Sequence, residues 1–197
     1  MLLFQSVLDS RGGLGGLPDN LNDLFAQSWN AGARIHTNSW GAAVNGAYNE
    51  TSRQVDEYIW NNNMIILFAA GNEGQSKTGS TVYNSISSPG SAKNCITVGA
   101  SENNRPEKGN YADNPNEIAA FSSRGNCKDG RVKPDIVAPG TWILSTKSSK
   151  APISNFWGEY NDKYAYMGGT SMATPITAGA VATAREYMIK EWKHTPS

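Results

Sequence analysis

Two largely apolar runs stand out in the pattern of hydrophobic and polar positions, MIILFAA at 64–70 and NCITVGA at 94–100. Each has the length of a strand and is shorter than a typical core helix. A strand that is apolar on both faces is typical of a parallel sheet that is covered on both sides. The two runs therefore predict central strands of such a sheet.

Helical and shorter extended segments surround these runs. Residues 51–62 are predicted to form an amphipathic helix because Val55, Tyr58 and Ile59 recur at i, i+3 and i+4. Two more helices are predicted, one capped by Asp19 or Asn20 and ended by Gly32, and one over 173–192. Shorter strands are predicted over 4–8, 33–40, 118–122, 135–140 and 141–146. The alternation of strands and helices predicts an α/β fold with a mainly parallel sheet.

Polar segments stand at the ends of two predicted strands: NSWG at 38–41 and GNEG at 71–74. In open parallel sheets, ligands bind outside the carboxyl ends of the strands. Both stretches are therefore expected at the same functional edge.

Composition narrows the function classes. The 197 residues suffice for one domain, and 17 basic and 17 acidic side chains give no net charge. A nucleic-acid or anionic-membrane partner would require a basic excess, so neither is expected. The longest apolar run is too short to span a bilayer, and the first ten residues lack the basic start of a signal peptide. Cys95 and Cys127 are expected to be free thiols, although a pairing between them is an alternative.

Ser171 and Asn72 are the candidate chemical groups. Ser171 follows two glycines at the start of the last predicted helix, where free backbone N–H groups favour a developing oxyanion. Taken alone, it is an ordinary helix cap. Asn72 is either an oxyanion donor at the sheet edge or a turn asparagine. A nucleophile-elbow arrangement fails because His194, the one histidine after Ser171, would lie about 30 Å along the helix.

Six motifs together resemble the subtilisin-like serine proteases, the subtilases. They are NSWG at 38–41, AAGNEG at 69–74, ITVGA at 96–100, FSSRG at 121–125, KPDIVAPG at 133–140 and GGTSMATPITAGAVA at 168–182. The sequence around NSWG is most similar to that of the oxidatively stable alkaline proteases of bacilli. The resemblance implies the subtilisin-like three-layer sandwich, an extracellular location and a serine endopeptidase that hydrolyses polypeptides.

The resemblance also implies a role for individual residues. Ser171 corresponds to the nucleophile, and Asn72 to the side-chain donor of the oxyanion hole. Ser39, Trp40 and Gly41 correspond to the strand edge that pairs with the substrate backbone. Five further residues correspond to the specificity pocket, and because they are small the pocket is expected to be roomy and apolar: Ala69, Ala70, Gly71, Gly169 and Thr170. The bond between Ser88 and Pro89 falls where the family often has a cis peptide.

The aspartate and histidine of the triad have no counterpart in the sequence. His36 falls in the middle of a strand, His194 in the tail and Asp9 in a turn, so structural roles are expected for all three. Residues 1–197 are therefore interpreted as the serine-bearing part of a subtilase domain, incomplete at the N-terminus, with the missing part as its partner. This chain alone is expected to be essentially inactive. The alternative is a non-catalytic, peptide-binding pseudo-protease.

The resemblance implies no cofactor for catalysis but does imply structural calcium. The loop 110–117 offers four oxygen-bearing side chains that suit calcium, although a solvated loop is the alternative: Asp113, Asn114, Asn116 and Glu117. The segment from Gly90 to Cys95 aligns with a weaker cation site built from carbonyl groups. No Cys/His cluster indicates zinc.

Overall fold

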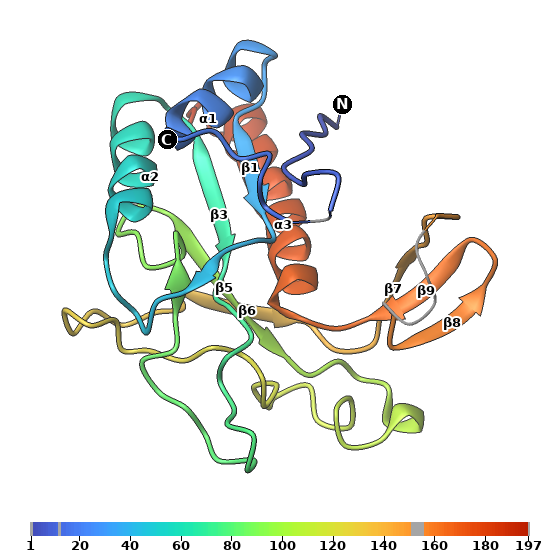
Figure 1. Cartoon of the computed structure of the whole chain (residues 1–197). Coiled ribbons are helices and arrows are strands. Elements are labelled where there is room, and N and C mark those ends of the chain that lie inside the picture. Colours follow the sequence, from blue (N-terminus) through green and yellow to red (C-terminus); the bar gives the residue numbers. More distant parts are fainter. Residues whose placement is uncertain (1, 12, 151–155, 197) are drawn as a thin grey trace.

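The computed structural model describes residues 2–11, 13–150 and 156–196. Its central sheet contains β1 (Ile35–Asn38), β3 (Ile65–Ala69), β5 (Ile96–Ser101) and β6 (Ile136–Pro139) in the order β1-β3-β5-β6, and all neighbouring pairs are parallel. Helices α1 (Leu21–Asn30) and α2 (Glu50–Asn61) lie on one side of the sheet, and α3 (Thr170–Glu191) on the other (Figure 1). The α/β fold with a mainly parallel sheet is confirmed.

Strand β3 shows why its sequence is apolar on both faces. Ile66 and Phe68 pack into a core with α1 and α2, whereas Leu67 packs against Ala173 and Ala178 of α3. Alternate side chains of one strand thus serve two separate cores. The strand is covered on both sides, as its composition requires.

The expected strand over 4–8 is wrong. This segment has no regular secondary structure, and the side chain of Phe4 is 95% exposed. It is attached to the fold through Gln5, whose amide donates to the carbonyl of Leu24. A strand needs a backbone ladder with a neighbour, and here a side-chain hydrogen bond holds the segment instead.

The expected strand over 118–122 is also wrong. Only one isolated bridge forms, between Ser101 and Ile118, and a turn then bonds Ser122 N–H to Ala119 O at 2.9 Å. The bridge to β5 has two hydrogen bonds, Glu102 N–H to Glu117 O and Ala119 N–H to Ala100 O, and the turn then bends the chain away before the pairing extends into a strand.

Two short sheets lie outside the central one. Strand β2 (Ala42–Ala43) pairs with β4 (Ser87–Ser88), and β7 (Ile143–Thr146) pairs with β9 (Tyr164–Met167), which also pairs with β8 (Gly158–Asn161). Strands β8 and β9 were not predicted from the sequence, although tyrosines alternate along β9. The short helix η1 (Pro106–Lys108) follows β5.

Helix α3 starts at Thr170, three residues earlier than expected, with Gly169 as its N-cap. Ser171 therefore lies inside the first turn. Pro175 lies in the second turn, where its missing N–H leaves the carbonyl of Ser171 without a helical donor.

Three smaller observations complete the fold. The Ser88–Pro89 bond is cis as expected. Cys95 and Cys127 are free and buried. Among the helices of the described ranges, none has both the length and the apolar character to cross a membrane.

Candidate active site

A pocket of about 180 Å³ opens where β1 and β3 end beside the start of α3. It brings together segments that lie more than one hundred residues apart in the sequence. Its lining residues are Ser39, Trp40, Gly41, Ala69, Gly71, Asn72, Glu73, Ser87, Thr170 and Ser171. Most of the residues expected in a peptide-binding site therefore share one cavity.

Two expected residues do not line this pocket. Ala70 is fully buried and packs with Ile86 and Cys127, because its side chain points into a small core behind the pocket. Gly169 lies behind the pocket lining. Its φ of 148° favours glycine, and a Cβ at this position would lie 3.7 Å from the side-chain amide of Asn72.

Ser171 and Ser39 are joined by two reciprocal hydrogen bonds. The hydroxyl of Ser171 donates to the carbonyl of Ser39 at 3.2 Å, and the hydroxyl of Ser39 donates to the carbonyl of Ser171 at 2.8 Å. The second bond gives the carbonyl of Ser171 a donor in place of the backbone N–H that Pro175 lacks. Strand edge and helix start are therefore held in a defined relation.

The amide of Asn72 is oriented by Thr170. Its oxygen accepts hydrogen bonds from the backbone N–H of Thr170 at 3.0 Å and from the Thr170 hydroxyl at 3.1 Å. Thr170 is fully buried, so this anchor is shielded from water. With the oxygen engaged, Nδ2 remains the donor that Asn72 can offer to a group in the pocket.

Glu73 and Ser87 are pocket residues that the sequence analysis missed. One carboxylate oxygen of Glu73 accepts from Ser123 Oγ at 3.1 Å and from Ser87 Oγ at 3.3 Å. Gly71 makes this packing feasible, because at its φ of 106° a Cβ would lie only 2.2 Å from Ser87 Oγ. The pocket expected to be apolar thus also contains a carboxylate. The sequence signal that could have indicated this carboxylate is the acidic residue in the GNEG motif.

Trp40 supports the strand edge from below. Its ring meets Phe68 edge to face, with 5.1 Å between ring centroids. Such a pair contributes beyond the area it buries. The segment 39–41, which lines the pocket, is therefore fixed to the core of the sheet.

His36 belongs to the core side of β1. Its Nε2 lies 2.8 Å from Oε1 of Gln5, and its ring meets Phe25 edge to face at 5.1 Å. Burial lowers the pKa of His36 from 6.5 to about 4. A histidine held neutral among these contacts is a packing residue.

His194 and Asp9 also have structural surroundings. His194 follows α3, and its backbone N–H bonds to Met188 O. The carboxylate of Asp9 accepts from the N–H groups of Arg11 and Gly13, both at 2.9 Å, and so stabilises a turn. Within the described residues, no histidine lines the pocket around Ser171.

The expected calcium ligands of loop 110–117 bond largely to one another. Asn114 Nδ2 donates to Glu117 at 2.9 Å, and Asn116 N–H donates to Asn114 at 3.2 Å. In the described part of the chain, no group of three or more His, Cys, Asp or Glu side chains gathers around a point that would suit a metal. Structural calcium remains a prediction.

Comparison with known proteins places the chain in a family. The subtilase family profile matches residues 8–196. The serine protease AprX of Bacillus subtilis is 38% identical over 132 residues, which cover 66% of this chain and 27% of AprX. A thermophilic serine proteinase of a Bacillus species is 32% identical over 181 residues, covering 92% of this chain and 35% of the relative.

Solved structures show the same fold. Sphericase is 28% identical with a TM-score of 0.54, covering 86% of this chain and 47% of sphericase. The protease domain of PatA is 24% identical with a TM-score of 0.63, covering 90% of this chain and 52% of that domain. The chain thus spans only about half of these structures, and about a third or less of the two Bacillus relatives. The chain belongs to the subtilase family of serine-type peptidases.

Proposed function

We propose that the protein carrying this chain is an endopeptidase that cleaves polypeptides through an acyl-enzyme on Ser171. The observation that carries the proposal is the shared pocket of Ser171, Asn72 and the strand edge 39–41. A nucleophile, an oxyanion donor and a backbone edge for the substrate are the parts that acyl transfer from a peptide requires.

The chemistry follows from these positions. Ser171 Oγ attacks the carbonyl carbon of the scissile bond and passes its proton to a base. The new oxyanion accepts hydrogen bonds from Asn72 Nδ2 and from the N–H of Ser171, which lies in the first helical turn where N–H groups lack helical acceptors. The C–N bond then breaks, the amine leaves with the proton, and water releases the acyl group by the reverse sequence.

The base must come from outside the described site. The sequence has two histidines, and the surroundings of His36 and His194 are structural. We propose that a further part of the same domain supplies the histidine and aspartate as its partner. Without them, Ser171 stays un-ionised and the 197 residues alone are essentially inactive.

The substrate is proposed to be a polypeptide bound in extended form along residues 39–41. The pocket beside this edge holds both small apolar groups and the carboxylate of Glu73. An extracellular location is proposed from the family. The second candidate function is a peptide-binding pseudo-protease, which is favoured by the absence of a histidine among the residues lining the described pocket.

A fluorophosphonate probe, which labels only activated serines, separates the two functions. The full-length protein should be labelled, and Ser171→Ala should abolish labelling and peptidase activity. Ser145→Ala is the matched control, since Ser145 is exposed on β7 away from the pocket. The isolated 197-residue chain should give no burst of product from an acyl ester. Unlabelled, folded full-length protein would establish the pseudo-protease instead.

A further inference from the structure

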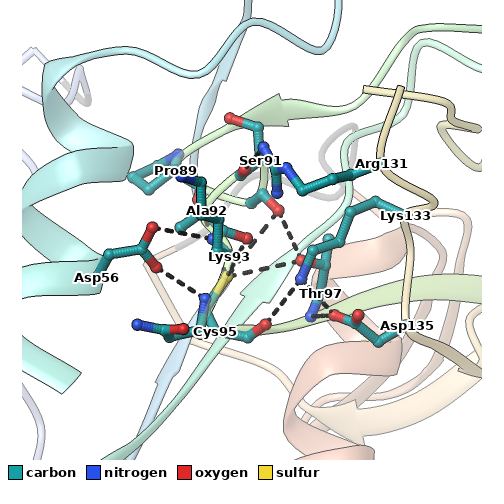
Figure 2. A network of polar contacts seen from close by, with 12 residues as sticks. Asp56, Pro89, Ser91, Ala92, Lys93, Cys95, Thr97, Arg131, Lys133 and Asp135 are labelled. Carbon is teal, nitrogen blue, oxygen red and sulfur yellow. Dashed lines mark hydrogen bonds and ion pairs between the residues drawn. The ribbon is translucent and has the colours of Figure 1, made fainter. Parts of the chain in front are cut away.

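The loop between β4 and β5 gathers backbone carbonyls around the thiol of Cys95. Sγ of Cys95 lies 3.9 Å from Pro89 O, 3.9 Å from Gly90 O and 3.8 Å from Ala92 O (Figure 2). Converging carbonyls of this kind suit a hard cation. This is also the segment, Gly90 to Cys95, for which the resemblance to the subtilases implies a weaker cation site.

Donors from the chain itself already engage two of the loop carbonyls. The hydroxyl of Thr97 donates to Gly90 O at 2.6 Å, and the ammonium of Lys133 donates to Cys95 O at 2.9 Å. Figure 2 shows Lys133 reaching this loop from the segment that precedes β6. The carbonyl group of Cys95 therefore faces a positive charge that belongs to the protein.

Lys133 is almost completely buried, with 4% of its side chain exposed. Its ammonium lies 2.6 Å from Asp135 Oδ2, and the same oxygen accepts the backbone N–H of Thr97 at 2.7 Å. A buried charge is tolerated when it is paired and hydrogen-bonded. Cys95 O and Asp135 thus form a negative recess that the ammonium neutralises.

We propose that Lys133 is a built-in counter-cation which takes the place of the predicted bound metal ion at this loop. The ammonium already occupies the oxygens of Cys95 and Asp135, and a metal ion bound beside it would bring two positive charges together, which repel each other. The residues present do not fit a metal while Lys133 is there. The loop is held by a covalently attached charge that dilution and chelation cannot remove.

Fixed charges fasten other parts of the same loop. Asp56 of α2 accepts the N–H groups of Lys93 at 3.1 Å and Asn94 at 2.7 Å, while Arg131 donates to Ser91 O at 2.9 Å. The backbone N–H of Ser91 in turn bonds to Ser87 O at 3.0 Å, and Ser87 lines the pocket. Lys133 is therefore one of several charged side chains that fasten this loop, which begins beside the pocket residue Ser87.

Cation rescue tests this inference independently of peptidase activity. The full-length protein and Lys133→Ala are unfolded thermally in choline chloride with a chelator, and then with added methylammonium, potassium or calcium. Removing the ammonium leaves Cys95 O without its donor and breaks the ion pair of Asp135, whose side chain is 42% exposed, so we expect Tm to fall by roughly 5 °C. Added cation should recover part of that loss in Lys133→Ala.

Two matched variants make the result specific. Lys128→Ala removes the same charge from an exposed site and should show no loss and no extra cation response. Lys133→Met fills the recess without charge, so it should be destabilised but not rescued. An equal cation response in wild type and Lys133→Ala overturns the proposal, and so does an unchanged Tm in Lys133→Ala.

A second comparison decides the matter if Lys133→Ala does not fold. Lys133→Met is compared with the double variant Lys133→Met, Asp135→Asn. If Lys133 neutralises Asp135, removing the carboxylate charge should recover part of the Tm lost in the single variant. No recovery would overturn the counter-cation role.

Discussion

At the residue scale, the site depends on side chains whose polar atoms are already hydrogen-bonded within the protein. Thr170 holds the oxygen of Asn72, and the hydroxyl of Ser39 holds the carbonyl of Ser171 that Pro175 leaves free. Such bonds fix orientation without using the atoms needed for chemistry. Asn72 Nδ2 thereby stays available to a group in the pocket, whereas Ser171 Oγ donates to Ser39 O at 3.2 Å and must give up that bond to react.

Replacing Asn72 tests the oxyanion role. Asn72→Ala in the full-length protein should lower kcat about 10²–10³-fold with little change in KM, the loss known from removing the oxyanion-hole asparagine of subtilisin. Steady-state kinetics on a peptide substrate measures it. Asn104→Ala, at an exposed loop position, is the control. A loss in kcat smaller than about tenfold would refute a donor role for Asn72.

Met172 gives a second prediction at this scale. It follows Ser171 directly and is partly exposed, so peroxide should reach its sulfur. The sulfoxide is larger and more polar, and we expect it to lower the activity of the full-length protein. Activity and peptide mapping are followed together during peroxide treatment. If activity falls while Met172 remains unmodified, the loss has another origin.

At the scale of elements, strand ends and a helix start form the site, and hydrophobic packing places them. Phe68 of β3 supports Trp40 beyond β1, while Ala173 and Ala178 seat α3 on the opposite face of the sheet. His36 likewise packs between β1 and α1, because its ring contacts the ring of Phe25. The packing of α1 against β1 therefore includes a titratable group.

The lowered pKa of His36 predicts an acid-sensitive fold. Its pKa in the folded protein is about 4, against 6.5 in an unfolded chain, so only the unfolded state takes up the proton between these values. The stabilisation is complete above pH 6.5 and is lost as the pH falls towards 4, by at most roughly 3 kcal/mol. Urea denaturation across this range measures it. His36→Leu should flatten this part of the pH profile, and an unaltered profile would contradict the prediction.

At the scale of the whole molecule, part of the surface is apolar and the central sheet has open ends. Leu2 and Phe4 are 91% and 95% exposed, and β1 is the terminal strand in the order β1-β3-β5-β6. Unpaired strand edges and apolar patches favour association with other chains. The N-terminal segment runs beside this end of the molecule (Figure 1).

The isolated 197 residues should therefore self-associate. Sedimentation velocity is expected to show oligomers or aggregates at micromolar concentration, and Phe4→Asp should increase the monomeric fraction by placing a charge in the apolar segment. A stable monomer that unfolds cooperatively would contradict this expectation. The measurement concerns only the isolated chain, so the full-length protein serves as the comparison.

Local sequence determined much of this protein. The continuous apolar run at 64–70 specified a strand buried on both faces, and the motifs around Asn72 and Ser171 specified the family. These inferences succeed because hydrophobic periodicity and short catalytic motifs are local properties. For the same reason the strand over 4–8 was predicted wrongly, since strand formation depends on a partner that local sequence does not reveal.

Tertiary structure alone decided how distant groups meet. It placed Ser39 against Ser171, added Glu73 and Ser87 to the pocket, directed Ala70 into a core, and set the ammonium of Lys133 against Cys95 O. Each of these results depends on which strand neighbours which and on the direction of a side chain at a loop. Residue spacing carries no information on either, because both are determined by the packing of the complete sheet between its helices.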